Sequence, residues 1–145
     1  MTILCPLDFS ATSAALVGYA AALAAAHGAE LRLLHVCEPR EDFPGPRPGG
    51  DDAPAPCAAQ LRALRAHAER AGAALVHTGI VHGEAAPEIV AEARRQRADL
   101  IVIGAHGRTG LTRFLMGTTA ETVLRTAPCA TFLLKTAGML ALNEE

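Results

Sequence analysis

The sequence has no tryptophan, one tyrosine and four phenylalanines, so aromatic residues make up only 3% of its 145 residues. It also has no excess of charge, because 13 lysines and arginines stand against 15 acidic residues, for a formal net charge of −2. Nucleic-acid-binding domains usually carry a basic patch, so this balance argues against a nucleic-acid partner. Half of the residues are apolar, and the core must therefore consist mainly of alanine, leucine, valine and isoleucine.

Long hydrophobic runs are missing as well. The longest, Ala14–Ala26, contains Gly18 and is shorter than the ~20 residues that a membrane-spanning helix needs. The first residues carry no basic segment and are soon interrupted by Pro6 and Asp8. We therefore predict neither a secretory leader nor a membrane anchor, and we expect a cytoplasmic protein.

The spacings that are typical of metal sites are also missing. The four cysteines include no C-x-x-C pair, and the six histidines include no H-x-x-x-H pair. The sequence accordingly predicts no metal ligands. Cys5 and Cys129 lie in apolar surroundings, where thiols act as small core residues.

The sequence does show a regular alternation of strand-like and helix-like patterns. Alternation without hairpin signals implies right-handed crossovers and a parallel sheet with helices on both faces. We predict a single doubly wound α/β domain over residues 1–137, followed by a tail at 138–145. The expected strands are Thr2–Cys5, Leu31–Val36, Leu75–Val81, Asp99–Ile103 and Thr131–Leu134.

Four helices are expected between these strands. The first is capped by Ser10, Thr12 or Ser13, carries Leu16, Tyr19, Leu23 and His27 on one face, and ends at Gly28. The second includes Leu61 to Ala71 and ends at Gly72, the third runs from Pro87 to about Ala98, and the fourth is Thr118–Thr126. Residues 38–56 contain six of the nine prolines. This composition predicts a loop without regular structure, which is either a solvated connector or a lid over a ligand.

The stretch 104–119 raises the question of function. It contains four glycines, four threonines and two arginines directly after a buried apolar run. Glycine N–H groups at Gly104 and Gly107 leave room for an anion, and Gly117 and Thr118 begin a helix, where free N–H groups and the helix dipole favour phosphate. Thr118 and Glu121 also fit a capping box, so the threonine hydroxyl caps the helix, contacts a phosphate, or does both.

The same stretch is neither of the common phosphate-binding motifs, because it has no G-x-x-x-x-G-K-[ST] and no G-x-G-x-x-G that opens a helix. Ligands of open parallel sheets bind beyond the carboxyl ends of the strands. Asp8, which follows the first strand, is expected at the same edge as Gly104. Arg108 and Arg113 are either partners of outer phosphates or surface charges, and His106 either contacts the ligand or is solvated.

The chain resembles the ATP-binding branch of the universal stress protein family, whose motif G-x2-G-x9-G-[ST] is matched by Gly104, Gly107, Gly117 and Thr118. The likeness extends to 3–10, 33–36, 98–104, 107–111 and 127–129. It departs from the family pattern at Ala105, where a hydroxyl residue is common, and at Ala130-Thr131, which replaces Pro-Val. The resemblance implies the strand order 3-2-1-4-5.

The resemblance also implies ATP, with accompanying magnesium, at the carboxyl edge of the sheet. Asp8 would accept hydrogen bonds from the ribose hydroxyls. Adenine would be framed by Pro6, Leu7 and Val36, with Ile103 nearby, and the triphosphate would be surrounded by Gly104, His106, Gly107, Arg108, Gly117, Thr118 and Thr119. Family members commonly form homodimers through the last strand, here Ala130–Leu134.

The sequence offers no obvious catalytic residue for phosphoryl transfer, which needs a positioned metal, a cationic clamp and a group that orients the nucleophile. The only lysine, Lys135, follows the last strand. We therefore predict a stress-response regulatory protein that binds ATP, hydrolyses it slowly or not at all, and acts on an unidentified protein partner. The alternatives are an adenylate-forming or other ATP-using enzyme of a related α/β fold, and a protein-interaction module that binds no nucleotide.

Overall fold

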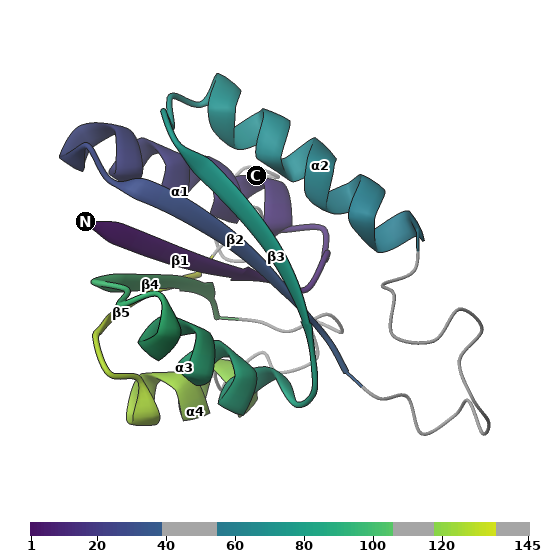
Figure 1. Ribbon diagram of the computed structural model, residues 1–145, viewed down its shortest axis with the longest axis vertical. Helices are drawn as coiled ribbons and strands as arrows, with labels where there is room; N and C mark the ends of the chain where they lie inside the picture. The colour runs from purple at the N-terminus through teal and green to yellow at the C-terminus, as the bar shows by residue number, and fades with distance from the viewer. Residues whose placement is uncertain (39–54, 106–117, 136–145) are drawn as a thin grey trace, which may run out of the picture.

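The computed structural model describes residues 1–38, 55–105 and 118–135. Five parallel strands form one sheet in the order β3-β2-β1-β4-β5, between two layers of helices (Figure 1). This confirms the predicted fold and strand order. The strands are β1 (Thr2–Leu7), β2 (Glu30–Cys37), β3 (Val76–His82), β4 (Leu100–Gly104) and β5 (Ala130–Leu134). The helices are α1 (Ser13–His27), α2 (Ala55–Arg70), α3 (Ala85–Arg95) and α4 (Thr118–Thr126).

Each face of the sheet carries its own apolar core, because the central strands are apolar on both sides. On one face, Ile3 and Leu33 pack with α1 and α2. On the other, Leu4 and Ile101 pack with α3 and α4. Figure 1 shows these helix pairs on opposite sides of the sheet. Among the helices of the described residues, none is both long and apolar enough to cross a membrane.

The buried face of α1 differs from the predicted one. Tyr19 and His27 are exposed, and Leu23 is only partly buried. The helix is apolar nearly all round, so its periodicity does not identify one face, and its alanines are the residues that allow close approach to the sheet. The buried positions are Ser13, Leu16, Val17, Ala20, Ala21 and Ala24.

Several element boundaries also differ from prediction. The predicted loop 38–56 was too long, because α2 already begins at Ala55. Pro56 is compatible with the first helical turn, where no backbone N–H is required. The third helix was predicted to begin at Pro87, but α3 begins two residues earlier, at Ala85. Pro87 likewise lies in the first helical turn, which tolerates proline. The end of α1 was predicted correctly at Gly28, whose φ of 61° is left-handed and whose N–H donates to the carbonyl of Ala24.

Candidate functional site

The chain leaves the ends of β1 and β4 toward opposite faces of the sheet. After β1 it enters α1 on one face, and after β4 it leads to α4 on the other. The two strands are neighbours, with Ile3 beside Leu100 and Leu4 beside Ile101. In a doubly wound sheet such a divergence marks the place where ligands bind. The geometry therefore supports the edge predicted from Asp8 and Gly104.

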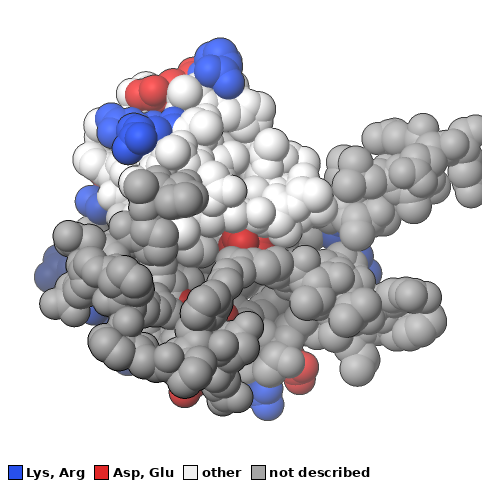
Figure 2. All heavy atoms as spheres, turned by 90° about the vertical axis from the view of Figure 1, so that its right-hand side faces the viewer, with Lys and Arg blue, Asp and Glu red and all other residues white. Residues whose placement is uncertain are grey.

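Figure 2 is turned so that the side toward which the strands of Figure 1 run faces the viewer. The described surface on this side is mostly uncharged, and both acidic and basic side chains are visible where it meets the residues drawn in grey. The carboxylate of Asp8 at this edge suits hydroxyl donors such as those of a sugar.

Asp8 sits in a tight turn directly after β1. The backbone N–H of Ser10 donates to Asp8 Oδ1 at 2.9 Å, which makes an Asx turn. Between them Phe9 has a φ of 59°, in the left-handed region that side-chain-bearing residues seldom occupy. Strained backbone of this kind persists where the surroundings hold it in place. The half-buried Asp8 carboxylate is thereby fixed at the strand end.

His35 on β2 is one of the groups that hold this turn. Its ring is buried, with 4% exposure, and its Nδ1 donates to the carbonyl oxygen of Leu7 at 2.8 Å. The ring of Phe9 stacks on the imidazole with centroids 4.1 Å apart. Sequence reasoning missed this role. The role follows from the register of β1 and β2, which places Leu7 directly beside His35. This register cannot be read from the sequence alone.

The predicted adenine-framing residues lie at the ends of three adjacent strands, but on both faces. Leu7 packs into the core beneath α1 and α2, whereas Val36 and Ile103 belong to the core beneath α3 and α4. By the alternation of side chains along β1, Pro6 faces the same side as Val36 and Ile103. The side chain of Leu7 is thus committed to the core, and any contact with a ligand at this edge would come from its backbone.

The end of β4 brings two further predicted residues to this edge. Gly104 pairs with Leu134 of β5 and is half-buried. Next to it, Ala105 is buried and its N–H donates to the Leu134 carbonyl at 2.9 Å. Thr119 lies half-buried in the first turn of α4. His106, Gly107, Arg108 and Gly117 lie outside the described residues, as does the side chain of Thr118, although α4 begins at Thr118 as predicted.

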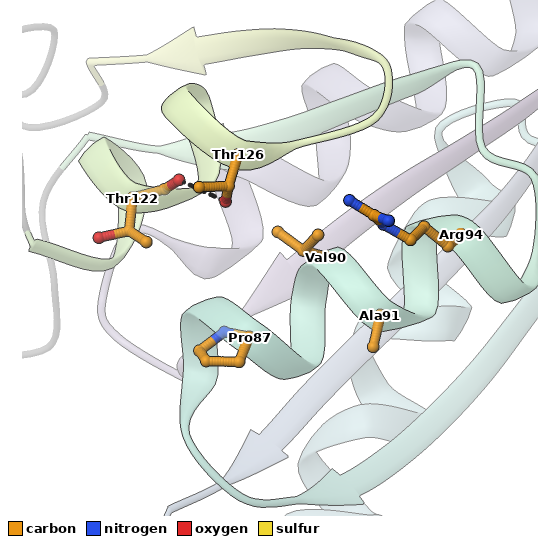
Figure 3. A pocket seen from close by; sticks show the side chains of 6 residues that line it. All are labelled: Pro87, Val90, Ala91, Arg94, Thr122 and Thr126. Atoms are coloured by element: carbon orange, nitrogen blue, oxygen red, sulfur yellow. Dashed lines mark hydrogen bonds between the residues drawn. The ribbon is translucent and has the colours of Figure 1, made fainter.

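A mostly apolar groove of about 400 Å³ lies elsewhere, between α3 and α4 (Figure 3). Val90 lies across the groove from Thr122 and Thr126, and the hydroxyl of Thr126 donates to the carbonyl of Thr122 at 2.7 Å. The lining includes none of the predicted site residues. It consists of Pro87, Val90, Ala91, Arg94, Thr122 and Thr126.

Glu30 is a carboxyl with a shifted pKa, and it lies at the opposite edge of the sheet. The hydroxyl of Thr2 donates to Glu30 Oε1 at 3.0 Å and lowers the pKa of this carboxyl. Burial, the second-largest effect, raises this pKa, and the charges of Arg32 and His77 lower it further. This cluster ties β1, β2 and β3 together where they begin, which is a structural role.

Comparison with known proteins agrees with this fold. The model of the universal stress protein family matches residues 1–135. A universal stress protein of Methanocaldococcus jannaschii is 45% identical over 60 residues, which cover 41% of this chain and 35% of that relative. A universal stress protein of Thermus aquaticus is 32% identical over 141 residues, which cover 92% of this chain and 98% of the relative.

Two solved structures of such proteins contain nucleotides. One, in complex with cAMP, superposes with a TM-score of 0.75 at 26% identity and covers 94% of this chain and 97% of its own. Another, from Archaeoglobus fulgidus in complex with dAMP, has a TM-score of 0.70 at 22% identity, with coverage of 93% and 98%.

Proposed function

Because the chain belongs to the universal stress protein family, we propose that it is an ATP-binding regulatory protein of the stress response. The observation that carries this proposal is the fixed carboxylate of Asp8 at the diverging ends of β1 and β4. A preorganised acceptor at this place suits the two hydroxyls of a ribose. Its location is cytoplasmic in this proposal.

In the proposed complex each part of the nucleotide has its own partners. Asp8 accepts from the ribose, while Pro6, Val36 and Ile103, with the backbone of Leu7, frame the adenine. The phosphates lie against Gly104 and the first turn of α4, including Thr119. Magnesium accompanies the ATP and neutralises part of its charge. The remaining phosphate contacts come from His106, Gly107, Arg108, Gly117 and Thr118.

The affinity expected of such a site is micromolar, which corresponds to about 8 kcal/mol. A helix dipole alone supplies about 0.3–1 kcal/mol. Four or five hydrogen bonds to charged groups, at about 1.5–3 kcal/mol each, supply the rest after the cost of ordering the ligand. The whole glycine motif is therefore needed, and the loss of one member should be measurable.

The relatives support an adenine nucleotide as ligand, since one is in complex with cAMP and another with dAMP. The choice of ATP over these monophosphates is supported by the complete motif Gly104, Gly107, Gly117 and Thr118. The only lysine of the sequence, Lys135, follows the last strand. The glycine motif also includes no carboxylate or glutamine that would orient a water molecule, and this favours slow hydrolysis of ATP or none.

We also propose a homodimer that pairs β5 with its copy. β5 is an edge strand whose residues, Ala130–Leu134, include no charge, and charge is the common protection of exposed edges. Phe132 on this strand is 38% exposed and Tyr19 of α1 is 39% exposed. Their rings lie 5.2 Å apart, so they form a continuous aromatic patch beside the edge.

Calorimetric titration of nucleotide-stripped protein with magnesium ATP tests the binding proposal. We expect saturable micromolar binding that Gly117→Val abolishes. Gly79→Val is the matched control, because a Cβ at Gly79 meets only Leu34 Cδ1 at 3.9 Å and the position is in edge strand β3. Parallel titrations with ADP, AMP and cAMP rank the phosphate requirement.

Three results would contradict the proposal. Folded protein that binds no adenine nucleotide would favour an interaction module. Pyrophosphate release with a carboxylic substrate would indicate an adenylate-forming enzyme. Turnover well above about 1 per second, the lower end for ordinary enzymes, would indicate an ATPase.

A further inference from the structure

Three side chains with metal-binding atoms meet beside the carboxyl end of β2. His35 and Cys37 come from β2, and Cys57 comes from the first turn of α2. One ligand atom from each residue lies within 4.8 Å of the other two. His35 and Cys37 are buried, and Cys57 is half-buried. These three described residues offer two sulfur atoms and one imidazole nitrogen, which are the donor atoms that thiophilic metals prefer.

The fold explains why these residues meet although their sequence spacing gives no metal motif. His35 and Cys37 are two apart on a strand, so their side chains point to the same face of the sheet. That face carries α1 and α2, and Cys57 sits on α2. The spacing rules used on the sequence look for ligands close together in one element, and they miss a third ligand supplied by the next helix.

The hydrogen bond of His35 prepares its imidazole for a metal. A carbonyl oxygen only accepts, so the 2.8 Å contact with Leu7 requires the proton on Nδ1. In the neutral ring the lone pair is then on Nε2. Metal-binding histidines typically donate their second N–H to a carbonyl or carboxylate, which fixes the tautomer and ring orientation. The stacked ring of Phe9 restrains the same imidazole.

The donor set selects the class of ion. Two thiolates and one imidazole suit Zn²⁺ or Cu⁺, and they are poor ligands for Mg²⁺ or Ca²⁺, which prefer oxygen. Zinc–sulfur bonds of about 2.3 Å in tetrahedral geometry separate two sulfurs by roughly 3.8 Å. In this protein the two sulfurs lie within 4.8 Å of each other, which is at most about 1 Å farther apart than in a zinc site. Small side-chain rotations are therefore enough to bring both sulfurs to zinc-binding distance. A disulfide at about 2.05 Å demands a larger movement.

We propose that His35, Cys37 and Cys57 form a binding site for one thiophilic cation, Zn²⁺ or Cu⁺. Binding displaces a proton from each thiol, and the two thiolates and the His35 nitrogen become ligands. With Zn²⁺, a water molecule completes four-coordination. The ion joins the end of β2 to the start of α2, the two elements that flank residues 39–54. None of its three ligands is a proposed nucleotide contact, and the site goes beyond the proposed function.

Metal titration of the fully reduced, full-length protein tests this site. Zn²⁺ is added in competition with a chromogenic chelator, and Cu⁺ is added without oxygen in competition with a cuprous chelator. We expect the protein to bind one equivalent of metal. Cys57→Ser should weaken the metal affinity by at least about 100-fold, because loss of an outer-shell partner alone already costs up to that much. Cobalt gives a second readout, because thiolate-to-metal charge transfer reports sulfur ligation directly.

Cys129→Ser is the matched control, since Cys129 is likewise a half-buried thiol but follows α4. It should leave binding unchanged. Circular dichroism of Cys57→Ser separates lost ligation from lost folding. Equal metal binding by the wild type and Cys57→Ser would overturn the site. So would failure of the reduced protein to bind either metal, and a Cys37–Cys57 disulfide formed on oxidation by protein that binds neither metal when reduced would assign the pair a redox role instead.

Discussion

Two substitutions at Asp8 separate its structural role from its proposed role in binding. Asp8 Oδ1 accepts the N–H of Ser10 at 2.9 Å, and the same carboxylate is the proposed acceptor for ribose hydroxyls. Asp8→Asn retains an oxygen for the turn but removes the charge. Asp8→Ala removes both the acceptor and the charge.

The expected magnitudes differ in a way that can be measured. A hydrogen bond from an N–H to a carboxylate, such as Ser10 to Asp8, contributes about 1.5–3 kcal/mol net, so Asp8→Ala should lower Tm by about 3–12 °C in a domain of this size. Asp8→Asn keeps a neutral acceptor for the same bond, so it should lower Tm by less, about 2–4 °C for a loss of about 1 kcal/mol. In Asp8→Asn, the hydrogen bond from each ribose hydroxyl should weaken by about 1 kcal/mol, because its acceptor becomes neutral. For two hydroxyls this corresponds to about a 30-fold weaker affinity for ATP.

Thermal unfolding and calorimetric titration with magnesium ATP measure both effects on the same samples. Asp99→Asn is the matched control, because Asp99 accepts the N–H of Thr2 at 2.8 Å on the opposite edge of the sheet. It should leave ATP affinity unchanged. If Asp8→Asn binds ATP within about threefold of wild type, a difference below 1 kcal/mol, the carboxylate does not hold the ribose. An equally large fall in Tm for both Asp8 variants would refute the assigned turn.

Four further predictions follow from the geometry. Gly28→Ala should lower the unfolding free energy by about 1 kcal/mol in urea titrations, because φ is 61° and a Cβ there meets nothing within 4 Å, so only backbone strain changes; unchanged stability would contradict this. Phe132→Lys should shift sedimenting dimers to monomers, since it charges the exposed edge, whereas dimers that persist would place the interface elsewhere. Burial raises the pKa of the Cys5 thiol to about 12, so iodoacetamide at pH 8 should spare Cys5 in folded, metal-free protein; peptide mapping that finds rapid alkylation there would disprove its protection. The pKa of Glu30 is lowered from 4.5, mainly by the Thr2 hydroxyl, so Glu30→Gln should cost stability at neutral pH, and the difference from wild type should vanish as pH falls through the folded-state pKa; a difference that grows in acid would show the opposite sign.

The sheet was predictable because its local signals agree with one another. Strand runs such as 100–103 are apolar on both faces, which is typical of a central parallel strand, and helix signals separate them in strict alternation. The end of α1 was also predictable from a local signal, because glycine tolerates the left-handed backbone conformation that Gly28 adopts there. Agreement between pattern and propensity leaves few topologies open.

The remaining features depend on contacts between distant segments. The alanine-rich α1 gives no preferred face from its own sequence, and the sheet decides that Tyr19 is exposed. The Asp8 turn depends on His35, which only the pairing of β1 with β2 brings near. Similarly, Cys57 joins His35 and Cys37 only because α2 covers that face. The part of the glycine motif that includes Gly107 and Gly117 stays a prediction, because residues 106–117 lie outside the described residues.

The two proposed sites share one hydrogen bond. His35 Nδ1 donates to the carbonyl of Leu7, and the next residue is Asp8, whose carboxylate is proposed to hold the ribose. A cation on the other ring nitrogen withdraws electrons from the imidazole and strengthens Nδ1–H as a donor, which tightens the end of β1. Any change in ATP affinity that the metal causes must then be matched by an equal change in metal affinity caused by ATP. Titrating each ligand in the presence of the other therefore measures one coupling free energy twice, and a coupling free energy of zero would exclude linkage through this bond.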